Sequence, residues 1–407
     1  MGFEPSERVK QIHYPIREVT VPARILEKKG IKILKLNIGD PCAYDFDSPP
    51  HLKEAIGKAT KDGWNGYTPS EGYPELLKAV AGRELERNGV KYEAEDLCVT
   101  AGITEAIQLL YFSALNPGDE ILIPGPVYPQ YITSTPLVDA KPVAYRTIEA
   151  EGWVPDLEDI KKKITPRTKA LVVINPNNPT GALYSRRALQ AICDEAGSRG
   201  NLFIISDEIY DELTYEGEQF TLASIGKDLP IVTLNGLSKT YLSPGWRIGW
   251  AMFNSPNGKL EEIKQSFVRL ARARLCPNSI CQRAALAALH GPKDYLKETN
   301  SKLKQRRDYC YKRFNQIRGI STTKPQGAFY IFPRILPLAE KWNNSPWKND
   351  KEFVLDVLNS AHVLVVNGSG FGETYGAAHF RSVILPPIDI LEEAFNQIER
   401  LMEKRLK

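Results

Sequence analysis

The stretch "LNGLSKTYLSPGWRIGW" (residues 234–250) places one lysine, Lys239, after an apolar run, and one arginine, Arg247, eight positions later. A lysine amine has an ordinary pKa of about 10.4, and it attacks a carbonyl only when it is neutral. A nearby cation and partial exclusion of water both favour the neutral form. The spacing therefore allows a nucleophilic lysine beside an anion-binding arginine, although most such residues are solvated or paired on a surface.

Three other strand-like runs are also followed by polar residues that could do chemistry. After "LCVT", Ile103 and Thr104 open a helix-like segment whose free N–H groups could bind a phosphate, although this feature taken alone favours an ordinary strand-to-helix turn. After "LVVIN", Asn178 lies in "NPNNPTG", where prolines and a glycine restrict the backbone, as they also do in a plain loop. After "LFIIS" come Asp207 and Tyr210, and the alternative role for this aspartate is a helix N-cap.

The elements that must position these residues alternate, from about residue 95, between strand-like and helix-like runs. The strand-like runs are "LCVT", "EILIP", "KPVAY", "KALVVIN", "NLFIIS" and "IVTLN". Continuous apolar runs are typical of strands that are buried on both faces, so we expect an α/β domain with a mostly parallel central sheet covered by helices on both faces. Ligands bind beyond the carboxyl ends of such strands, where the polar residues fall.

The composition changes after about residue 292, where a long basic helix-like segment, short strand-like runs and a terminal amphipathic helix follow. This pattern predicts a smaller α+β domain. We expect a large cofactor-binding domain over residues 46–291, and a small domain built from residues 1–45 and 292–407 with an N-terminal closing segment.

The overall composition is that of a globular protein with small-molecule partners. Of 407 residues, 42% are hydrophobic and 25% charged, and the formal net charge of +4 is too weak to predict binding to nucleic acid or to an anionic membrane. The six cysteines show no C-x-x-C spacing, and neither a signal peptide nor a membrane-spanning run is evident. We therefore expect a cytoplasmic protein, and we predict no metal site.

Four motifs, in order, are "NPNNPTG", "SDEIYDEL", "SKTYLSPGWRIGW" and "HFRSVILP". Together they resemble the pyridoxal-phosphate-dependent aminotransferases of fold type I, class I/II, and the resemblance covers almost the whole chain. Within that group the chain looks most like alanine aminotransferases of bacteria and archaea, through "LKLNIGDP", "ITPRTKALVVINPNNPTGALYS", "NGLSKTY" and "HFRSVILP".

The resemblance implies a role for each of the polar residues around the cofactor. Lys239 would bind the cofactor aldehyde covalently and then act as the proton carrier, and Arg247 would bind the phosphate. Asp207 would pair with the pyridine nitrogen, and Tyr210 and Asn178 would hydrogen-bond the ring hydroxyl. The remaining cofactor contacts that it implies are ring stacking by Tyr128, phosphate binding by the amides of Ile103 and Thr104 and by the Ser238 hydroxyl, and a contact from Tyr67 to the phosphate of a neighbouring subunit.

The resemblance also implies how the substrates bind. Arg381 would grip the α-carboxylate of an L-amino acid or 2-oxo acid, helped by the backbone of Gly39, and Asn178 would also face the substrate. The contact from Tyr67 implies a homodimer with shared active sites.

Two departures bear on the details of binding. Where related aspartate-specific enzymes have a lysine, this chain has Thr104, which makes aspartate a weaker candidate. The second departure is at Gly236 and is described below.

We hypothesise that Tyr14 narrows the side-chain pocket and that Arg17 receives the distal carboxylate of glutamate, although a surface or interface salt bridge is equally open for Arg17. At Gly236 some relatives have a hydroxyl for the phosphate, so the phosphate contacts are expected to rely more on Ser238 and backbone amides.

The predicted reaction is L-alanine + 2-oxoglutarate = pyruvate + L-glutamate by a ping-pong mechanism. Aspartate, aromatic or broad-specificity transamination and β-elimination of sulfur compounds are alternatives that keep the cofactor. A non-catalytic ligand-sensing regulator is the alternative from another class, and Lys239 argues against it.

Overall fold

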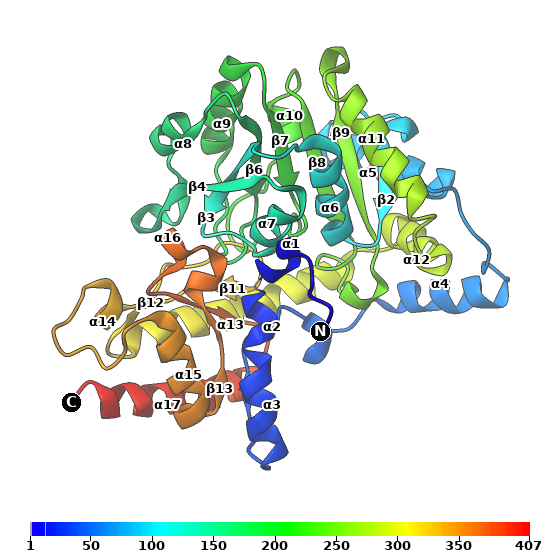
Figure 1. The fold of residues 1–407 in the computed structure, drawn as a ribbon. Coiled ribbons are helices and arrows are strands. Elements are labelled where there is room, and N and C mark those ends of the chain that lie inside the picture. The colour runs from blue at the N-terminus through cyan, green and yellow to red at the C-terminus, as the bar shows by residue number, and fades with distance from the viewer. Residues whose placement is uncertain (1, 13) are drawn as a thin grey trace.

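A central sheet of eight strands organises the upper part of the molecule (Figure 1). The computed structural model describes residues 2–12 and 14–407. In sheet order the strands are β2 (Leu97–Thr100), β9 (Gly249–Asn254), β8 (Ile231–Gly236), β7 (Phe203–Asp207), β6 (Thr168–Ile174), β3 (Glu120–Gly125), β4 (Lys141–Ile148) and β5 (Val154–Pro155). The five strands from β8 to β4 are mutually parallel, whereas β9 is antiparallel to both of its neighbours and β5 is antiparallel to β4. The mostly parallel sheet confirms the predicted α/β class, but β9 was not among the predicted strands.

Helices cover both faces of this sheet, which explains the continuous apolar runs of its strands. In β6, Val172 packs with the apolar residues of one helical layer and Val173 with those of the opposite layer, because successive side chains of a strand point to opposite faces. One layer contains α6 (Ile103–Ala114), α7 (Gln130–Thr133) and α11 (Glu261–Ala273). The other contains α4 (Pro50–Lys61), α5 (Pro74–Asn88), α8 (Leu157–Lys163), α9 (Arg186–Arg199), α10 (Leu222–Ile225) and α12 (Ser279–His290).

The lower part of the molecule is built mainly from the carboxy-terminal third of the chain (Figure 1). Its helices are α13 (Asp294–Gln316), α14 (Leu336–Ala339), α15 (Asp350–Ala361), α16 (Glu373–Gly376) and α17 (Ile388–Arg405). Its strands are β10 (Ile320–Ser321), which pairs with β12 (Arg334–Ile335), and the antiparallel set β11 (Tyr330–Ile331), β15 (Phe380–Val383) and β14 (Val366–Asn367). The last strand, β13 (Val363–Leu364), pairs in parallel with β1 (Leu34–Lys35) from the amino-terminal part of the chain.

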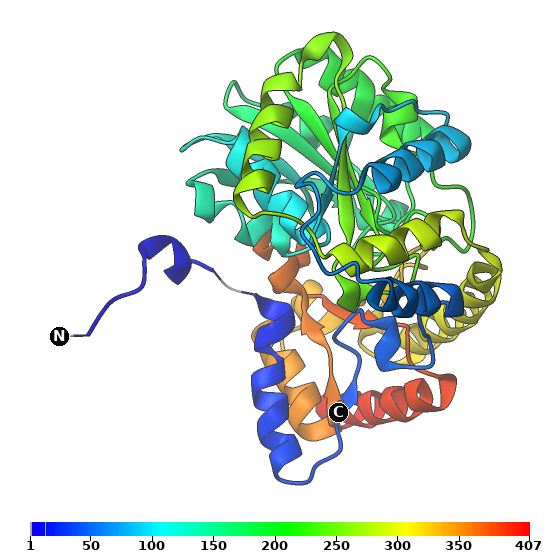
Figure 2. The same cartoon turned by 90° about the vertical axis from the view of Figure 1, so that its right-hand side faces the viewer.

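The amino-terminal segment contains α1 (Glu7–Lys10), α2 (Pro15–Glu18) and α3 (Thr20–Lys28). Helix α3 runs beside α15 and β13 (Figures 1 and 2). Its Ala23 packs in one apolar cluster with Leu358 and Leu364. This packing holds α2, which carries Arg17, next to the junction between the upper and lower parts.

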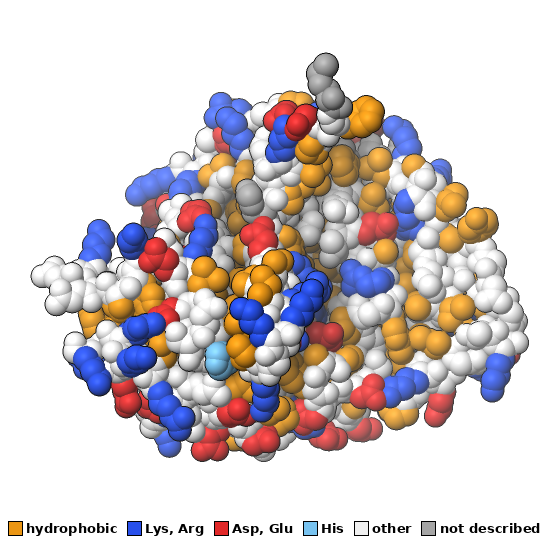
Figure 3. Space-filling view, turned by 60° about the horizontal axis from the view of Figure 1, so that its bottom comes forward, with side chains coloured by type: hydrophobic (Ala, Val, Ile, Leu, Met, Phe, Trp, Pro, Cys, Tyr) orange, Lys and Arg blue, Asp and Glu red, His pale blue; other side chains and the backbone are white. Residues whose placement is uncertain are grey.

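The surface mixes charges of both signs. Figure 3 shows Lys and Arg side chains interspersed with Asp and Glu over the face that it presents, in line with the small net charge. Among residues 2–12 and 14–407, no helix combines the length and apolar character that crossing a membrane requires.

Candidate active site

A cavity of about 600 Å³ lies at the carboxyl ends of the parallel strands, between the upper and lower parts of the molecule. Its volume is in the range of small-molecule sites, and its position is where open α/β sheets bind ligands. Thirteen of the residues singled out from the sequence line it: Tyr14, Arg17, Gly39, Ile103, Thr104, Tyr128, Asn178, Asp207, Tyr210, Ser238, Lys239, Arg247 and Arg381.

Lys239 reaches this cavity from the turn that follows β8. Its Nζ donates a hydrogen bond of 2.7 Å to the backbone oxygen of Gly39. Burial lowers the pKa of Lys239 to about 8, against the opposing effect of Asp40, and the charges of Arg381 and Arg247 add to the lowering. A substantial fraction of the amine is therefore neutral near physiological pH, as a nucleophile or proton acceptor requires.

Asp207 is the last residue of β7 and is 2% exposed. Its carboxylate accepts hydrogen bonds from the hydroxyl of Tyr131, at 2.9 Å, and from the backbone N–H of Ile209, at 3.3 Å. Burial raises the pKa of Asp207 to about 6, although both hydrogen bonds oppose the rise. The N-cap alternative is wrong, because no helix begins at Asp207 and its bond to Ile209 belongs to a turn.

Arg381 lies in β15 and is 1% exposed. Its Nη1 donates to Asn178 Oδ1 at 3.0 Å, and its Nη2 donates to the backbone oxygen of Asn37 at 2.7 Å. The guanidinium carbon lies 4.4 Å from the ring centre of Tyr330 and 4.7 Å from that of Phe371. Within the described part of the chain, Arg381 Nε has no hydrogen-bond partner and no carboxylate pairs with the guanidinium.

Arg247 and the start of α6 form the end of the cavity that could take a phosphate. Helix α6 begins after Gly102 without a side-chain cap, so that the first N–H groups of the helix are available to an anion. Gly102 has a φ of +75°, and a Cβ there would lie 2.5 Å from Arg247 Nη2, so only glycine lets the arginine approach the helix start. Arg247 also donates to the backbone oxygen of Ala101 at 3.2 Å.

Gly236 does not line the cavity. A Cβ at this position would lie 2.7 Å from both Gly249 Cα and the Ile248 oxygen, in the antiparallel pair of β8 and β9. The two strands approach each other so closely here that no side chain would fit.

Two pairs of tyrosine hydroxyls lie on the wall of the cavity. Tyr14 Oη is 2.9 Å from Tyr128 Oη, which ties the amino-terminal segment to the upper part of the molecule. Tyr210 Oη is 3.0 Å from Tyr330 Oη.

Some residues of the site were not found from the sequence, and one candidate lies elsewhere. Tyr131 follows Tyr128 at helical spacing in "YPQY", which could have indicated a second tyrosine at the site, and Tyr330 lies in the strand-like run "GAFYIF", where nothing distinguishes it from the other buried residues. Asn37 carried no signal of its own, since it contacts Arg381 through its backbone. Tyr67 does not line the cavity and is 85% exposed.

Comparison with known proteins decides the family. Residues 31–392 match the family model described as aminotransferase class I and II. The chain belongs to this family. It is similar to an alanine aminotransferase from Pyrococcus furiosus, with 57% identity, a TM-score of 0.95 and coverage of 99% of this chain and 100% of that one. It is also 37% identical to the glutamate-pyruvate aminotransferase AlaA of Escherichia coli (strain K12), over 98% of both chains, and 34% identical to an aspartate aminotransferase of Rhizobium meliloti, over 91% of this chain and 90% of the other. The resemblance seen in the sequence is thus confirmed, and the protein is an aminotransferase.

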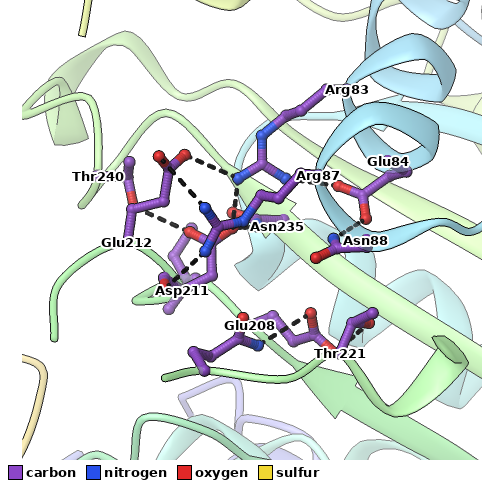
Figure 4. Close-up of polar contacts among 12 residues, drawn as sticks. Arg83, Glu84, Arg87, Asn88, Glu208, Asp211, Glu212, Thr221, Asn235 and Thr240 are labelled. Carbon is purple, nitrogen blue, oxygen red and sulfur yellow. Dashed lines mark hydrogen bonds and ion pairs between the residues drawn. The ribbon is translucent and has the colours of Figure 1, made fainter. Parts of the chain in front are cut away.

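A second group of buried charges in this aminotransferase includes Asp211 and Thr240, the residues that follow Tyr210 and Lys239 in the sequence (Figure 4). We call it the Arg83 cluster; its members are Arg83, Glu84, Asp211, Glu212, Asn235 and Thr240. Arg83, from α5, forms ion pairs with all three carboxylates, and the one to Glu212 measures 3.0 Å. Although burial opposes it, the charges of Arg83 and Arg87 hold the pKa of Asp211 below its usual value.

Proposed function

We propose that this aminotransferase uses pyridoxal 5'-phosphate to move an amino group between L-alanine and 2-oxoglutarate, giving pyruvate and L-glutamate. The observation that carries the proposal is one cavity that holds a lysine with a lowered pKa, a buried aspartate and a buried arginine that lacks a carboxylate partner. The names of the Pyrococcus furiosus and Escherichia coli relatives support the choice of alanine, glutamate and pyruvate.

The residues of the cavity fit this cofactor. Asp207 is buried, and within the described part of the chain its hydrogen-bond donors are neutral, so a protonated pyridine nitrogen is a cation that would compensate its charge. Arg247 and the uncapped start of α6 fit a phosphate, together with the N–H groups of Ile103 and Thr104 and the Ser238 hydroxyl. In this proposal Tyr210 and Asn178 hold the ring oxygen and Tyr128 stacks on the ring.

The bound cofactor supplies an aldehyde and a ring that accepts the electron pair left when the substrate α-proton is removed. The chain supplies the rest. Arg381 binds the substrate α-carboxylate by paired charge-assisted hydrogen bonds, and the Gly39 backbone limits where that carboxylate lies. The neutral amine of Lys239 would carry the proton away from the α-carbon of the amino acid and, in the reverse half-reaction, would deliver a proton to the α-carbon of the second substrate.

The selection of substrate is assigned to the amino-terminal segment. Tyr14, fixed by its hydrogen bond to Tyr128, narrows the side-chain pocket to the size of alanine. Arg17 is exposed and lines the cavity, and no ion pair engages it within residues 2–12 and 14–407, so it is available for the distal carboxylate of a five-carbon substrate. The aspartate aminotransferase relative makes aspartate the second candidate substrate.

The assembly that we propose is a homodimer in which Tyr67 reaches the phosphate site of a second copy. Its support is the high exposure of Tyr67 and its position outside the cavity of its own chain. We also propose a cytoplasmic location, supported by six cysteines that are all free thiols.

The proposed function is tested by half-reactions. The purified protein, loaded with pyridoxal phosphate, is mixed with single amino acids while the visible absorption of the bound cofactor is recorded. We expect L-alanine and L-glutamate to bleach it and L-aspartate to do so at least about tenfold less efficiently. Failure of both alanine and glutamate would overturn the substrate assignment.

A pair of arginine variants tests the role of Arg17. Arg17→Ala should raise the KM for glutamate about tenfold and leave that for alanine within a factor of two, because only glutamate has a distal carboxylate. Arg24→Ala is the matched control: it removes a second exposed arginine of the same segment that does not line the cavity. Equal effects of Arg17→Ala on both substrates would refute the assigned role.

A further inference from the structure

Tyr330 contacts both ends of the active site. Its hydroxyl lies 3.0 Å from that of Tyr210, and the two rings meet nearly at right angles, with centres 5.8 Å apart. Its ring face lies 4.4 Å from the guanidinium carbon of Arg381. Tyr330, which is 3% exposed, therefore touches two residues with proposed binding roles. Tyr210 is proposed to bind the ring oxygen of the cofactor, and Arg381 is proposed to bind the substrate carboxylate.

The position of Tyr330 is well determined by its surroundings. It lies in β11, paired with Val383 of β15, two residues beyond Arg381. A Cβ at Gly39 would overlap the Tyr330 hydroxyl, so that glycine leaves the space which the phenol occupies. The phenol oxygen is thus held in one place, where the Tyr210 hydroxyl lies within hydrogen-bond distance.

A phenol has one hydrogen to donate and can accept others through its oxygen. If Tyr210 donated to Tyr330, its hydrogen would not be available to the cofactor. If Tyr330 donates to Tyr210, the Tyr210 hydrogen is free, and a phenol that accepts a hydrogen bond becomes a better donor in turn. Only the second arrangement is compatible with Tyr210 as a donor to the ring oxygen.

We propose that Tyr330 is a positioning residue: its hydroxyl donates to Tyr210 and so directs the Tyr210 hydroxyl toward the ring oxygen of the cofactor, while its ring supports the guanidinium of Arg381. The inference rests on the proposed use of pyridoxal phosphate. The hydroxyl and the ring have separate tasks, so two substitutions can separate them.

Tyr330→Phe tests the hydroxyl. A donor to the ring oxygen withdraws negative charge that otherwise holds a proton on the Lys239 nitrogen, so a weaker donor should move the pH midpoint of the cofactor's visible absorption upward. We expect a shift of about half a pH unit and a fall in kcat of about fivefold, with the KM for alanine within a factor of two. The matched control is Tyr145→Phe, which removes a buried hydroxyl that donates to the Val172 oxygen outside the cavity and should leave the midpoint unchanged.

Tyr330→Leu tests the ring. It removes both the hydroxyl and the aromatic face, so the KM for alanine should rise about tenfold in addition to the shift in midpoint, because Arg381 loses a cation–π contact. The melting temperature of each loaded variant is measured to show that it is folded. A folded Tyr330→Phe protein with the wild-type midpoint would overturn the inference, as would a Tyr330→Leu protein whose KM equals that of Tyr330→Phe.

These outcomes are distinct from failure of the proposed function. If the wild-type protein shows no visible absorption that depends on Lys239, the cofactor assignment fails and the Tyr330 inference fails with it. If the wild-type absorption is present and bleached by alanine but Tyr330→Phe has no effect on its midpoint, the function stands and only the role of Tyr330 is refuted.

Discussion

The active-site cavity and the Arg83 cluster both bury several charges at neighbouring strand ends, but they differ in how far those charges are ion-paired. In the cluster, Asp211 accepts hydrogen bonds from Asn235 and Thr240, each at 3.0 Å, and pairs with Arg83 (Figure 4). In the cavity, Asp207 and Lys239 have only neutral hydrogen-bond partners among residues 2–12 and 14–407.

The difference shows in the net direction in which the pKa of each group is displaced, since burial raises the pKa of both aspartates and only Asp211 has arginines that reverse the effect. Arg83 and Arg87 hold the pKa of Asp211 below its usual value, so its charge is stabilised within the fold. The pKa of Asp207 is raised and that of Lys239 is lowered, so both groups are less charged than they would be in water. Uncompensated burial of this kind destabilises a fold and is characteristic of functional sites, whereas a cluster of ion-paired charges is more often structural.

Replacing the reactive amine should have the largest effect. Lys239→Ala is expected to lower kcat by roughly 10⁴-fold or more, because both the covalent anchor and the proton carrier are lost, while thermal stability falls little. The control is Lys264→Ala, since Lys264 is paired with Asp96 and Glu261, at 3.0 Å each, and lies outside the cavity. Its activity should be retained, and turnover by Lys239→Ala near the wild-type rate would contradict the assignment.

Breaking the paired cluster should act on stability. Asp211→Asn removes a carboxylate from the buried Arg83 and is expected to lower the free energy of unfolding by about 3–5 kcal/mol, the range found when one partner of a buried ion pair is lost. Thermal and denaturant unfolding measure the effect. A variant as stable as the wild type would show that Glu84 and Glu212 suffice for Arg83.

The pH dependence of stability should reveal the uncompensated Asp207. Its pKa of about 6 in the folded protein lies above the unfolded value of 3.8, so the folded state binds more protons between these values. The protonated carboxyl contributes its full stability below about pH 4, and this contribution is lost as the pH rises through 6. The loss is on the order of 3 kcal/mol, because each pKa unit corresponds to about 1.4 kcal/mol. Melting curves of cofactor-free wild type and Asp207→Asn between pH 4 and 7.5 check this, and parallel pH profiles would argue against it.

An exposed pair should have the smallest effect. Lys58 and Asp62 form an i,i+4 pair of 2.6 Å on α4, but their side chains are 75% and 42% exposed. Lys58→Ala should change the free energy of unfolding by less than about 0.5 kcal/mol, and less still in high salt, because water and ions screen the pair. If Lys58→Ala lowered the free energy of unfolding as much as Asp211→Asn does, the size of the effect would depend on ion pairing and not on burial.

Much of the fold and site was predictable because the signals are local. The runs that became β6, β7 and β8 are continuous and apolar, and the residues that follow them, Asn178, Asp207 and Lys239, line one cavity as strand ends in a parallel sheet should. The domain division at residues 46 and 292 and the dimer contact of Tyr67 stay predictions.

What was not predicted depends on contacts between distant parts of the chain. Tyr131 reaches Asp207 across 76 positions, and Tyr330 reaches Tyr210 across 120. Strand β9 was not predicted because its antiparallel position between β2 and β8 depends on the order of the strands in the sheet, which the sequence does not show.

The sequence by itself determined the family and the likeness to alanine aminotransferases, and it predicted Lys239 as the reactive lysine, because motif order and residue type are written along the chain. Only the tertiary structure decided which buried charges are compensated. Asp207 and Asp211 are four positions apart and chemically identical, and they differ in pKa because one faces the cavity and the other faces Arg83. The burial of a carboxylate and its pairing with an arginine depend on residues that are distant in the sequence and that the fold places beside it. The sequence around either aspartate does not contain this information.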